Sequence, residues 1–428
     1  MNKTVAFYTL GCKLNFSETS TIGRQLSAIG FEKINFNKKA DLYVINTCSV
    51  TENANKECRR IIRKAKRIAP NSKVIVTGCY AQLKPEEITV INGVDMVLGA
   101  NEKFNIPKLL SNKKKIEKIN RHEINHLDYH ASFSLNDRTR SFLKIQDGCN
   151  YPCTYCTIPF ARGKSRCDSI ENIIKNAKEI AKNGIKEIVL TGVNIGEFND
   201  KDNGRDFATL LKELEKVKGI ERYRISSIEP NLITDEIINF VKQSKKFMPH
   251  FHIPLQSGSD IILSKMKRRY NTKLYKDKIN AITKGIPNVC IGADVIVGFP
   301  GENENEFNKT LHFIKDLHIS YLHVFSYSER DNTKAIKLNG IVNKAKRAKR
   351  SKQLRILSNK LKRNFYQRYI DDEQTALFER ENKDGYLFGF TDNYIKVKIP
   401  FSKKFLQQKL KIKLLSFDEN SNILSKVK

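Results

Sequence analysis

Short apolar runs alternate with amphipathic stretches over the N-terminal quarter of the chain. The runs KTVAFYTL, DLYVIN and KVIVTG predict strands. Helices are expected at residues 18–29, with Ser17 as the N-cap and Gly30 after the last turn, and at residues 53–69, ended by Pro70. Strands and helices in alternation are typical of a parallel, doubly wound sheet, so the expected fold class is α/β.

A second alternating block begins at residue 141. Its expected strands are SFLKIQ, KEIVLTG, RYRISS, HFHIPLQ, CIGADVIVGF and YLHVFSY, with helical patterns between them. Six strand and helix units predict a partial (βα) barrel, in which functional side chains belong at the carboxyl ends of the strands. Residues 112–140 are polar and show little periodicity, which indicates a linker or an excursion at the edge of the first sheet.

The C-terminal part of the chain changes character twice. Residues 341–370 contain many lysines and arginines but no acidic residue, and they predict a basic amphipathic helix whose apolar residues are Leu354, Leu357, Leu361 and Phe365. Beyond Asp372, short apolar runs and an Asp-Gly turn predict a small β-barrel. Three domains are therefore expected, at residues 1–112, 135–366 and 367–428.

The charge balance favours a polyanionic partner. The 428 residues include 77 lysines and arginines against 46 acidic residues, a formal net charge of +31. Such a field attracts nucleic acid, although a genome rich in lysine codons would raise the surface charge without any such partner. No apolar run reaches the roughly 18 residues of a membrane helix, and the N-terminal run is too short for a signal peptide. We therefore expect a cytoplasmic protein with no membrane partner.

The chain has nine cysteines, and because the cytoplasm keeps thiols reduced, metal binding or catalysis is a better expectation than disulfides. The stretch DGCNYPCTYCTIP places Cys149, Cys153 and Cys156 in a C-x3-C-x2-C loop after the strand SFLKIQ. Three thiolates on one loop can hold three irons of a [4Fe–4S] cluster and leave one iron open to a ligand. A structural zinc site is the alternative, but it would normally need a fourth ligand closer than Cys167.

Three further cysteines occupy equivalent places in the first sheet, because Cys12, Cys48 and Cys79 each come directly after a predicted strand. The carboxyl ends of parallel strands share one edge of a sheet, so these thiols can meet there. A lone cysteine is more often a small buried residue, but three in equivalent positions predict a second cluster site with an open iron. The other cysteines lack this setting and are expected to be structural: Cys58, Cys167 and Cys290.

At the Cys149 loop the chain resembles the radical S-adenosylmethionine (SAM) enzymes. The stretches TLGCKLN, NTCSVTENA and GCYAQ are similar to those of methylthiotransferases. The stretches DGCNYPCTYCTIPFARGKSR, GVNIGEF, HIPLQSGSDIILSKMKRRY and DVIVGFPGE are most similar to the MtaB type, the tRNA threonylcarbamoyladenosine methylthiotransferases. The resemblance covers nearly the whole chain and implies an N-terminal methylthiotransferase domain, a radical SAM partial barrel and a C-terminal TRAM-type RNA-binding barrel.

The resemblance implies methylthiolation of C2 of N6-threonylcarbamoyladenosine at position 37 of tRNA. Cys149, Cys153 and Cys156 would hold the cluster that binds and reduces SAM to give a 5′-deoxyadenosyl radical. An unactivated C–H bond such as adenine C2–H needs a radical cofactor, since acid–base groups are of little use there. An auxiliary [4Fe–4S] cluster would present sulfur for methylation by a second SAM, and its ligands would be Cys12, Cys48 and Cys79. The implied partners are tRNA, not DNA, and an electron donor of the flavodoxin or ferredoxin type.

Further contacts are expected from position along the barrel strands. The candidates for SAM are Tyr155, Thr191, Asn194, Ser227, Gln256, Asp294 and Gly298, with polar satisfaction at the barrel ends as the alternative. The threonyl carboxylate of the substrate invites an arginine, and the candidates are Arg162, Arg268 and Arg269. A basic surface that meets tRNA phosphate is the alternative for each. Aromatic residues of the last barrel are expected to contact RNA or to be core: Phe388, Phe390 and Tyr394.

Two other functions compete with this interpretation. Sister enzymes apply the same chemistry to isopentenyladenosine in tRNA or to an aspartate of a ribosomal protein, and the basic charge favours RNA over the protein. A non-catalytic RNA-binding module with zinc on its cysteines is a different class, but it gives no reason for a six-unit barrel.

Overall fold

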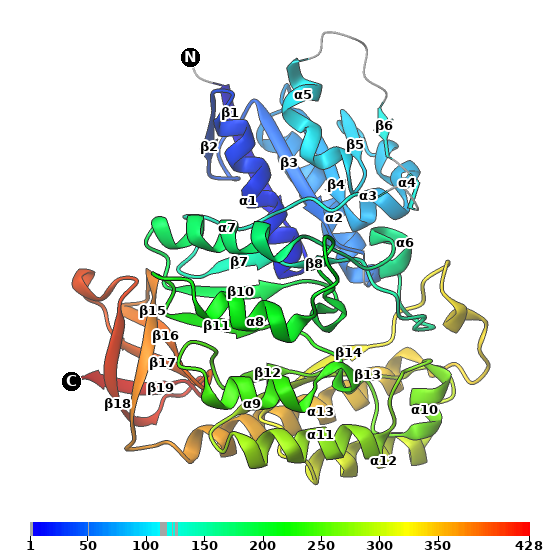
Figure 1. The fold of residues 1–428 in the computed structure, drawn as a ribbon. Coiled ribbons are helices and arrows are strands. Elements are labelled where there is room, and N and C mark those ends of the chain that lie inside the picture. The colour runs from blue at the N-terminus through cyan, green and yellow to red at the C-terminus, as the bar shows by residue number, and fades with distance from the viewer. Residues whose placement is uncertain (1–2, 50, 112–117, 122, 125–126) are drawn as a thin grey trace.

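The computed structural model describes residues 3–49, 51–111, 118–121, 123–124 and 127–428, and it forms three consecutive units (Figure 1). The first is a parallel sheet of the order β2-β1-β3-β4-β5-β6. Its strands are β1 (Lys3–Thr9), β2 (Phe31–Ile34), β3 (Leu42–Thr47), β4 (Lys73–Gly78), β5 (Met96–Leu98) and β6 (Ile119–Asn120). Its helices are α1 (Lys13–Ser27), α2 (Glu52–Ile68), α3 (Cys79–Leu83), α4 (Pro85–Thr89), the 3₁₀-helix η1 (Glu102–Asn105) and α5 (Ile106–Ser111).

The central strand β3 is buried along its whole length and packs on both faces. Tyr43 and Ile45 share a core with α2, whereas Leu42 and Val44 share a second core with α1. Because successive side chains of a strand point to opposite faces, one apolar run can serve both cores. The predicted doubly wound sheet is confirmed.

One predicted helix boundary is wrong. The helix expected at 18–29 begins at Lys13, and its N-cap is Cys12 rather than Ser17. Ser17 lies inside the helix, buried, where its hydroxyl donates to the Leu14 carbonyl at 2.8 Å. A serine that bonds back to its own helix leaves no sequence signal different from an N-cap serine. The polar stretch 112–140 also contributes a short edge strand, β6.

The second unit contains six parallel strands in two linked sheets, β11-β10-β7 and β12-β13-β14. Backbone bridges from Tyr223 to Phe247 and from Ser227 to His252 connect them. The strands are β7 (Ser141–Lys144), β10 (Glu187–Thr191), β11 (Arg222–Ile225), β12 (His250–His252), β13 (Cys290–Val297) and β14 (Tyr321–Ser326). The main helices are α7 (Ile170–Lys182), α8 (Phe207–Glu215), α9 (Asp235–Gln243), α10 (Asp260–Lys265), α11 (Thr272–Gly285) and α12 (Glu304–Lys315). This is the partial barrel that the pattern predicted.

Short helices and strands lie within the loops at the strand ends. They are β8 (Gln146–Asp147), α6 (Ile158–Arg162), β9 (Arg166–Cys167), η3 (Ile195–Glu197), η4 (Pro230–Leu232) and η5 (Lys334–Lys337). The helix α13 (Lys344–Gln367) follows and matches the predicted basic helix, because it lies against β14 with Leu354 and Phe365 buried. Within the described residues, no helix has the length and apolar character to cross a bilayer.

The third unit is a closed antiparallel barrel, apart from the parallel pair β17 and β19, of the order β15-β16-β17-β19-β18. Its elements are β15 (Glu373–Lys383), β16 (Tyr386–Thr391), β17 (Lys396–Pro400), η6 (Lys403–Phe405), β18 (Lys409–Phe417) and β19 (Ile423–Val427). The predicted Asp-Gly turn joins β15 to β16, with positive φ at both Asp384 and Gly385. The predicted small β-barrel is therefore confirmed.

The aromatic residues of this barrel face two ways. Phe390 and Tyr394 stack on each other with centroids 4.7 Å apart, and Tyr394 also lies 4.3 Å from the His250 ring of β12. The contact with RNA predicted for Tyr394 therefore competes with a packing role against the central barrel. Phe388 lies under the ammonium of Lys396, at 4.7 Å.

Candidate functional site

Three cysteines come together at the carboxyl edge of the first sheet. The strands β1, β3 and β4 are neighbours, and Cys12, Cys48 and Cys79 each follow the end of one of them. A Cβ built on Gly11 would lie 3.0 Å from Sγ of Cys48, so the turn before Cys12 closely approaches Cys48. Cysteines that are distant in the sequence thus share one edge of the sheet, as the strand pattern predicted.

Glycine precedes two of these cysteines for a steric reason. Gly11 has φ +98°, and a Cβ on it would lie 2.8 Å from Cβ of Cys48. Gly78 also has φ +98°, and a Cβ there would lie 2.4 Å from the carbonyl oxygen of Thr47. Only glycine combines this backbone conformation with so close an approach, so the turns that aim Cys12 and Cys79 depend on it.

The second set, Cys149, Cys153 and Cys156, lies on one loop after β8. The backbone N–H of Cys156 donates to the Cys153 carbonyl at 3.2 Å, and the N–H of Cys149 donates to the Gly163 carbonyl at 3.1 Å. Burial raises the pKa of all three thiols, that of Cys156 to about 12. Such thiols ionise when a metal replaces the proton, as iron–sulfur ligation requires.

Arg268 is built into this loop. Its Nη1 lies 2.9 Å from Sγ of Cys153 and 3.3 Å from the hydroxyl of Tyr155, and its Nη2 pairs with Glu229. A guanidinium at this distance favours the thiolate form of Cys153, since it lowers a pKa that burial raises. The neighbouring Arg269 is exposed and lies 4.2 Å over the ring of Tyr151.

Several predicted SAM residues lie at the strand ends of the barrel. Thr191 is buried at the end of β10 and donates to the Val189 carbonyl at 3.0 Å. Asn194 is buried two residues into the following turn, beside Glu197. Gly298 follows β13 with φ +74°, and its N–H donates to Glu302 at 2.7 Å.

Unsatisfied polar atoms mark this end of the barrel. Oε1 of Gln256 is buried without a hydrogen-bond partner among the described residues, and Gln256 has a positive φ of 61°. The hydroxyl of Ser226 is likewise buried and unpaired, whereas the predicted Ser227 forms the backbone bridge to His252. Buried polar atoms without partners are costly, so these atoms fit a polar ligand at the strand ends.

Asp294 is held in a different way from the other predicted SAM residues. Its Oδ1 lies 2.9 Å from Nε2 of His252 and 3.3 Å from Nδ1 of His323. Although burial alone would raise the pKa of Asp294, the two imidazoles lower it below its ordinary value. Asp294, which we predicted to contact SAM, therefore has two histidine side chains of the protein as partners.

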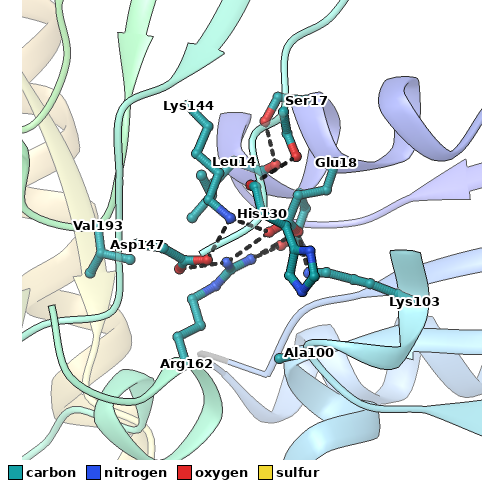
Figure 2. Close-up of polar contacts among 12 residues, drawn as sticks. Leu14, Ser17, Glu18, Ala100, Lys103, His130, Lys144, Asp147, Arg162 and Val193 are labelled. Atoms are coloured by element: carbon teal, nitrogen blue, oxygen red, sulfur yellow. Dashed lines mark hydrogen bonds and ion pairs between the residues drawn. The ribbon is translucent and has the colours of Figure 1, made fainter. Parts of the chain in front are cut away.

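Five charged side chains, none from the cysteine sets, form a buried cluster between the first sheet and the barrel (Figure 2). We call it the interdomain charge cluster; its members are Glu18, Lys103, Lys144, Asp147 and Arg162. Arg162 Nη1 lies 3.0 Å from Glu18 Oε1 and 2.9 Å from Asp147 Oδ1. Lys103 pairs with Glu18 at 2.6 Å, and Lys144 pairs with Asp147 at 2.7 Å.

The interdomain charge cluster joins the two cysteine sets. Glu18 lies on α1, whose N-cap is Cys12, whereas Asp147 lies two residues before Cys149. Burial alone would raise the pKa of Glu18, but Arg162, Lys103 and Lys144 lower it to about 2. The carboxylate is therefore ionised, and the contacts of Arg162 reach from one cysteine-bearing segment to the other.

The structure gives the three predicted substrate arginines different positions. Arg162 is only 3% exposed and its guanidinium is used by Glu18, Asp147 and Asn15, so the expected role as a reader of a substrate carboxylate is not supported. The guanidinium of Arg268 contacts Sγ of Cys153 on the cluster loop. Of the three, Arg269 is the exposed one.

Sequence reasoning missed the partners of these groups, namely Glu18, Asp147, Glu229, His252 and His323. Glu18 and Asp147 sit in segments whose motifs drew attention to the cysteines, and nothing local shows that they meet. The two histidines had a usable signal, because HFHIP and YLHVF place each at an alternate position of a predicted strand.

Comparison with known proteins identifies the family. Residues 4–99 match the Uncharacterized protein family UPF0004, and residues 143–314 match the Radical SAM superfamily. Over 425 residues the chain is 40% identical to the threonylcarbamoyladenosine tRNA methylthiotransferase MtaB of Bacillus subtilis (strain 168), covering 96% of this chain and 94% of the relative. The chain belongs to the radical SAM methylthiotransferases.

Other methylthiotransferases are similar over the same length. The MtaB protein of Aquifex aeolicus (strain VF5) is 39% identical over 402 residues, covering 92% of this chain and 96% of the relative. The tRNA-2-methylthio-N(6)-dimethylallyladenosine synthase of Thermodesulfovibrio yellowstonii is 30% identical over 401 residues, covering 93% of each. Among solved structures, the radical SAM methyltransferase TsrM of Kitasatospora setae has a TM-score of 0.57 at 12% identity, covering 78% and 77% of the two chains. That likeness shows the fold alone.

Membership in this methylthiotransferase family implies one [4Fe–4S] cluster and SAM, and the residues present fit both. Three thiols on one loop, with Arg268 beside Cys153, are a donor set that would suit the cluster. The unpaired atoms of Ser226 and Gln256 lie at the strand ends where the polar parts of SAM would be held.

Proposed function

We propose that this methylthiotransferase modifies C2 of N6-threonylcarbamoyladenosine at position 37 of tRNA. The observation that carries the proposal is the pair of three-cysteine sets joined through the interdomain charge cluster. A radical SAM enzyme needs one such set, and a second set within reach of the first suits delivery of sulfur to the same substrate. Identities of 36–40% with MtaB enzymes support the choice of nucleoside, against 30–33% for dimethylallyladenosine enzymes.

The chain's own residues have separable tasks in this proposal. Cys149, Cys153 and Cys156 would hold the cluster that, when bound with SAM, supplies a radical able to act on an unactivated C–H bond. Cys12, Cys48 and Cys79 would hold the auxiliary cluster. Around Cys149, Cys153 and Cys156, Arg268 favours the thiolate of Cys153. The loop residue Tyr155 and the candidates after the barrel strands would orient SAM: Thr191, Asn194, Ser227, Gln256 and Gly298.

The interdomain charge cluster positions the two cysteine sets. Replacing a buried ion pair by apolar residues is often neutral for stability. The five buried charges are therefore better explained by a role in positioning the two segments than by a contribution to stability. Arg162 has a planar guanidinium that bonds three partners in fixed directions, on α1 and on β8. It therefore fixes the orientation of the Cys12 helix relative to the Cys149 loop.

The partner tRNA is supported by the net charge of +31 and by the barrel at the C-terminus. Lys396 over Phe388 combines a cation with a half-buried ring, a pairing suited to a nucleic-acid strand. We propose the domain boundaries 1–112, 135–366 and 367–428 for this division of labour. An electron donor of the flavodoxin or ferredoxin type and a cytoplasmic location stay predictions.

The test is mass spectrometry of nucleosides from the tRNA of a host that lacks its own methylthiotransferases and expresses this chain. The expected product is 2-methylthio-N6-threonylcarbamoyladenosine, which disappears in both Cys153→Ala and Cys79→Ala. Cys290→Ala is the matched control, because that cysteine is buried beside the C-terminal barrel, apart from both sets. A methylthio derivative of isopentenyladenosine instead would assign the sister substrate.

A further inference from the structure

A second group of ionisable side chains lies inside the barrel, apart from the cysteine loops. His252 ends β12, Asp294 lies in β13 and His323 lies in β14, and these strands are neighbours. Both imidazoles approach one oxygen of Asp294, at 2.9 Å and 3.3 Å. We call these three residues the imidazole site.

The imidazole site faces the interior of the barrel. The register places His323 opposite Asp294, so both side chains emerge on the same face of the sheet. The alternate residues Ala293 and Val295 belong to the core that the strands share with the helices. The opposite face is therefore the inner one, and solvent reaches it, because the side chain of His323 is 55% exposed.

Asp294 decides which imidazole nitrogens are free. A carboxylate oxygen accepts, so Nε2 of His252 and Nδ1 of His323 each carry a proton toward it. In a neutral ring the remaining nitrogen is an acceptor. His252 Nδ1 and His323 Nε2 are then two acceptors held on the inner face of the barrel, ready for N–H or O–H donors.

We propose that the imidazole site binds the N6 side chain of the substrate nucleoside. A threonylcarbamoyl group has ureido N–H donors, a hydroxyl and a carboxylate. The free imidazole nitrogens accept from the ureido N–H and the hydroxyl. The inference rests on the proposed function and assigns Asp294 to the substrate rather than to SAM.

This assignment explains a choice between substrates. A dimethylallyl side chain has no hydroxyl and no ureido group, so it would leave the free imidazole nitrogens without partners. A site built to bond a polar group rejects the analogue that lacks it, by about 10⁴-fold in favourable cases. The inner face of this barrel therefore selects for the threonylcarbamoyl nucleoside.

The experiment compares two anticodon stem-loop RNAs that differ only at position 37, one with threonylcarbamoyladenosine and one with dimethylallyladenosine. Holoenzyme with iron content matched between variants is assayed for kcat/KM on each RNA. His323→Leu is expected to lower the preference for the threonylcarbamoyl RNA about fivefold, the effect of one lost hydrogen bond between neutral groups. His312→Leu is the control, since that exposed imidazole lies on α12 and bonds only the Asn308 carbonyl among the described residues.

Each outcome of this experiment either supports or overturns the inference. An unchanged preference in His323→Leu overturns the inference while the proposed function stands. If the wild type modifies neither RNA, the proposed function fails and the inference with it. A divalent metal is the rival occupant, because two imidazoles and a carboxylate can ligate one. Stoichiometric zinc in the wild-type holoenzyme, lost in His323→Leu, would therefore also overturn the inference.

Discussion

The two cysteine sets of this chain are assembled in different ways. Cys149, Cys153 and Cys156 lie on one loop, where backbone hydrogen bonds of short sequence range shape them. Cys12, Cys48 and Cys79 come from three strands and meet only when the first sheet has formed. A local site depends on its loop, whereas a site built across strands depends on the tertiary structure around it. The set of Cys12, Cys48 and Cys79 should therefore be the more sensitive to changes elsewhere in the fold.

The largest expected effect follows from Glu18→Gln. Loss of this carboxylate leaves Asp147 as the remaining carboxylate of the interdomain charge cluster, beside Arg162, Lys103 and Lys144. Breaking a buried ion pair on one side costs about 3–5 kcal/mol, and we expect the free energy of unfolding to fall by that amount. Anaerobic denaturant titration measures it.

The matched control for Glu18 is Glu57→Gln on α2. Glu57 pairs with Arg60 at the surface, where ion pairs contribute roughly 0–1 kcal/mol. Similar losses for the two variants would contradict the structural role of the interdomain charge cluster.

A smaller effect, confined to one set, is expected from Gly78→Ala. The substitution adds the strain of a positive φ, about 1–3 kcal/mol, and a clash with the Thr47 carbonyl, so Cys79 moves. We expect reconstituted protein to lose roughly half of its iron while the Cys149 loop keeps its cluster, if each set ligates one. Iron and sulfide analysis with EPR spectroscopy of the reduced protein distinguishes the two clusters.

The Gly30→Ala variant separates the effect of backbone strain from the effect of the steric clash at Gly78. Gly30 has φ +88° but nothing within 4 Å of an added Cβ, so it carries the same conformational cost without displacing a cysteine. Equal iron loss in the two alanine variants would show that steric contact at Gly78 does not matter.

The most gradual effect is the pH dependence that Glu18 confers. Its pKa is about 2 in the folded chain, below the ordinary value of 4.5. Because the folded-state pKa is depressed, the ionised carboxylate stabilises the fold fully above 4.5, and this stabilisation is lost as the pH falls from 4.5 toward 2. The free energy of unfolding of cluster-free protein should decline less steeply over this window in Glu18→Gln than in the wild type. Parallel curves would contradict the assignment.

Much of this architecture could be predicted from the sequence. The strands of both sheets and the small barrel followed from apolar runs, and the meeting of Cys12, Cys48 and Cys79 followed from the rule that parallel strands end at one edge. Arg162 shows the limit of prediction from the sequence. Its position in FARGKSR suggested a substrate contact, but two of its three partners, Asn15 and Glu18, are 147 and 144 residues away in the sequence. Only packing reveals that a charged residue is buried, so the cluster loop could be predicted and the interdomain charge cluster could not.

The central claim is that two cysteine sets perform separate parts of one reaction. The direct measurement is to incubate reconstituted enzyme with SAM, reductant and threonylcarbamoylated stem-loop RNA, and to quantify 5′-deoxyadenosine and the methylthiolated nucleoside. We predict both products for the wild type, neither for the triple alanine variant of Cys149, Cys153 and Cys156, and 5′-deoxyadenosine without methylthiolated nucleoside for that of Cys12, Cys48 and Cys79. Methylthiolation that survives in the last variant would contradict the account.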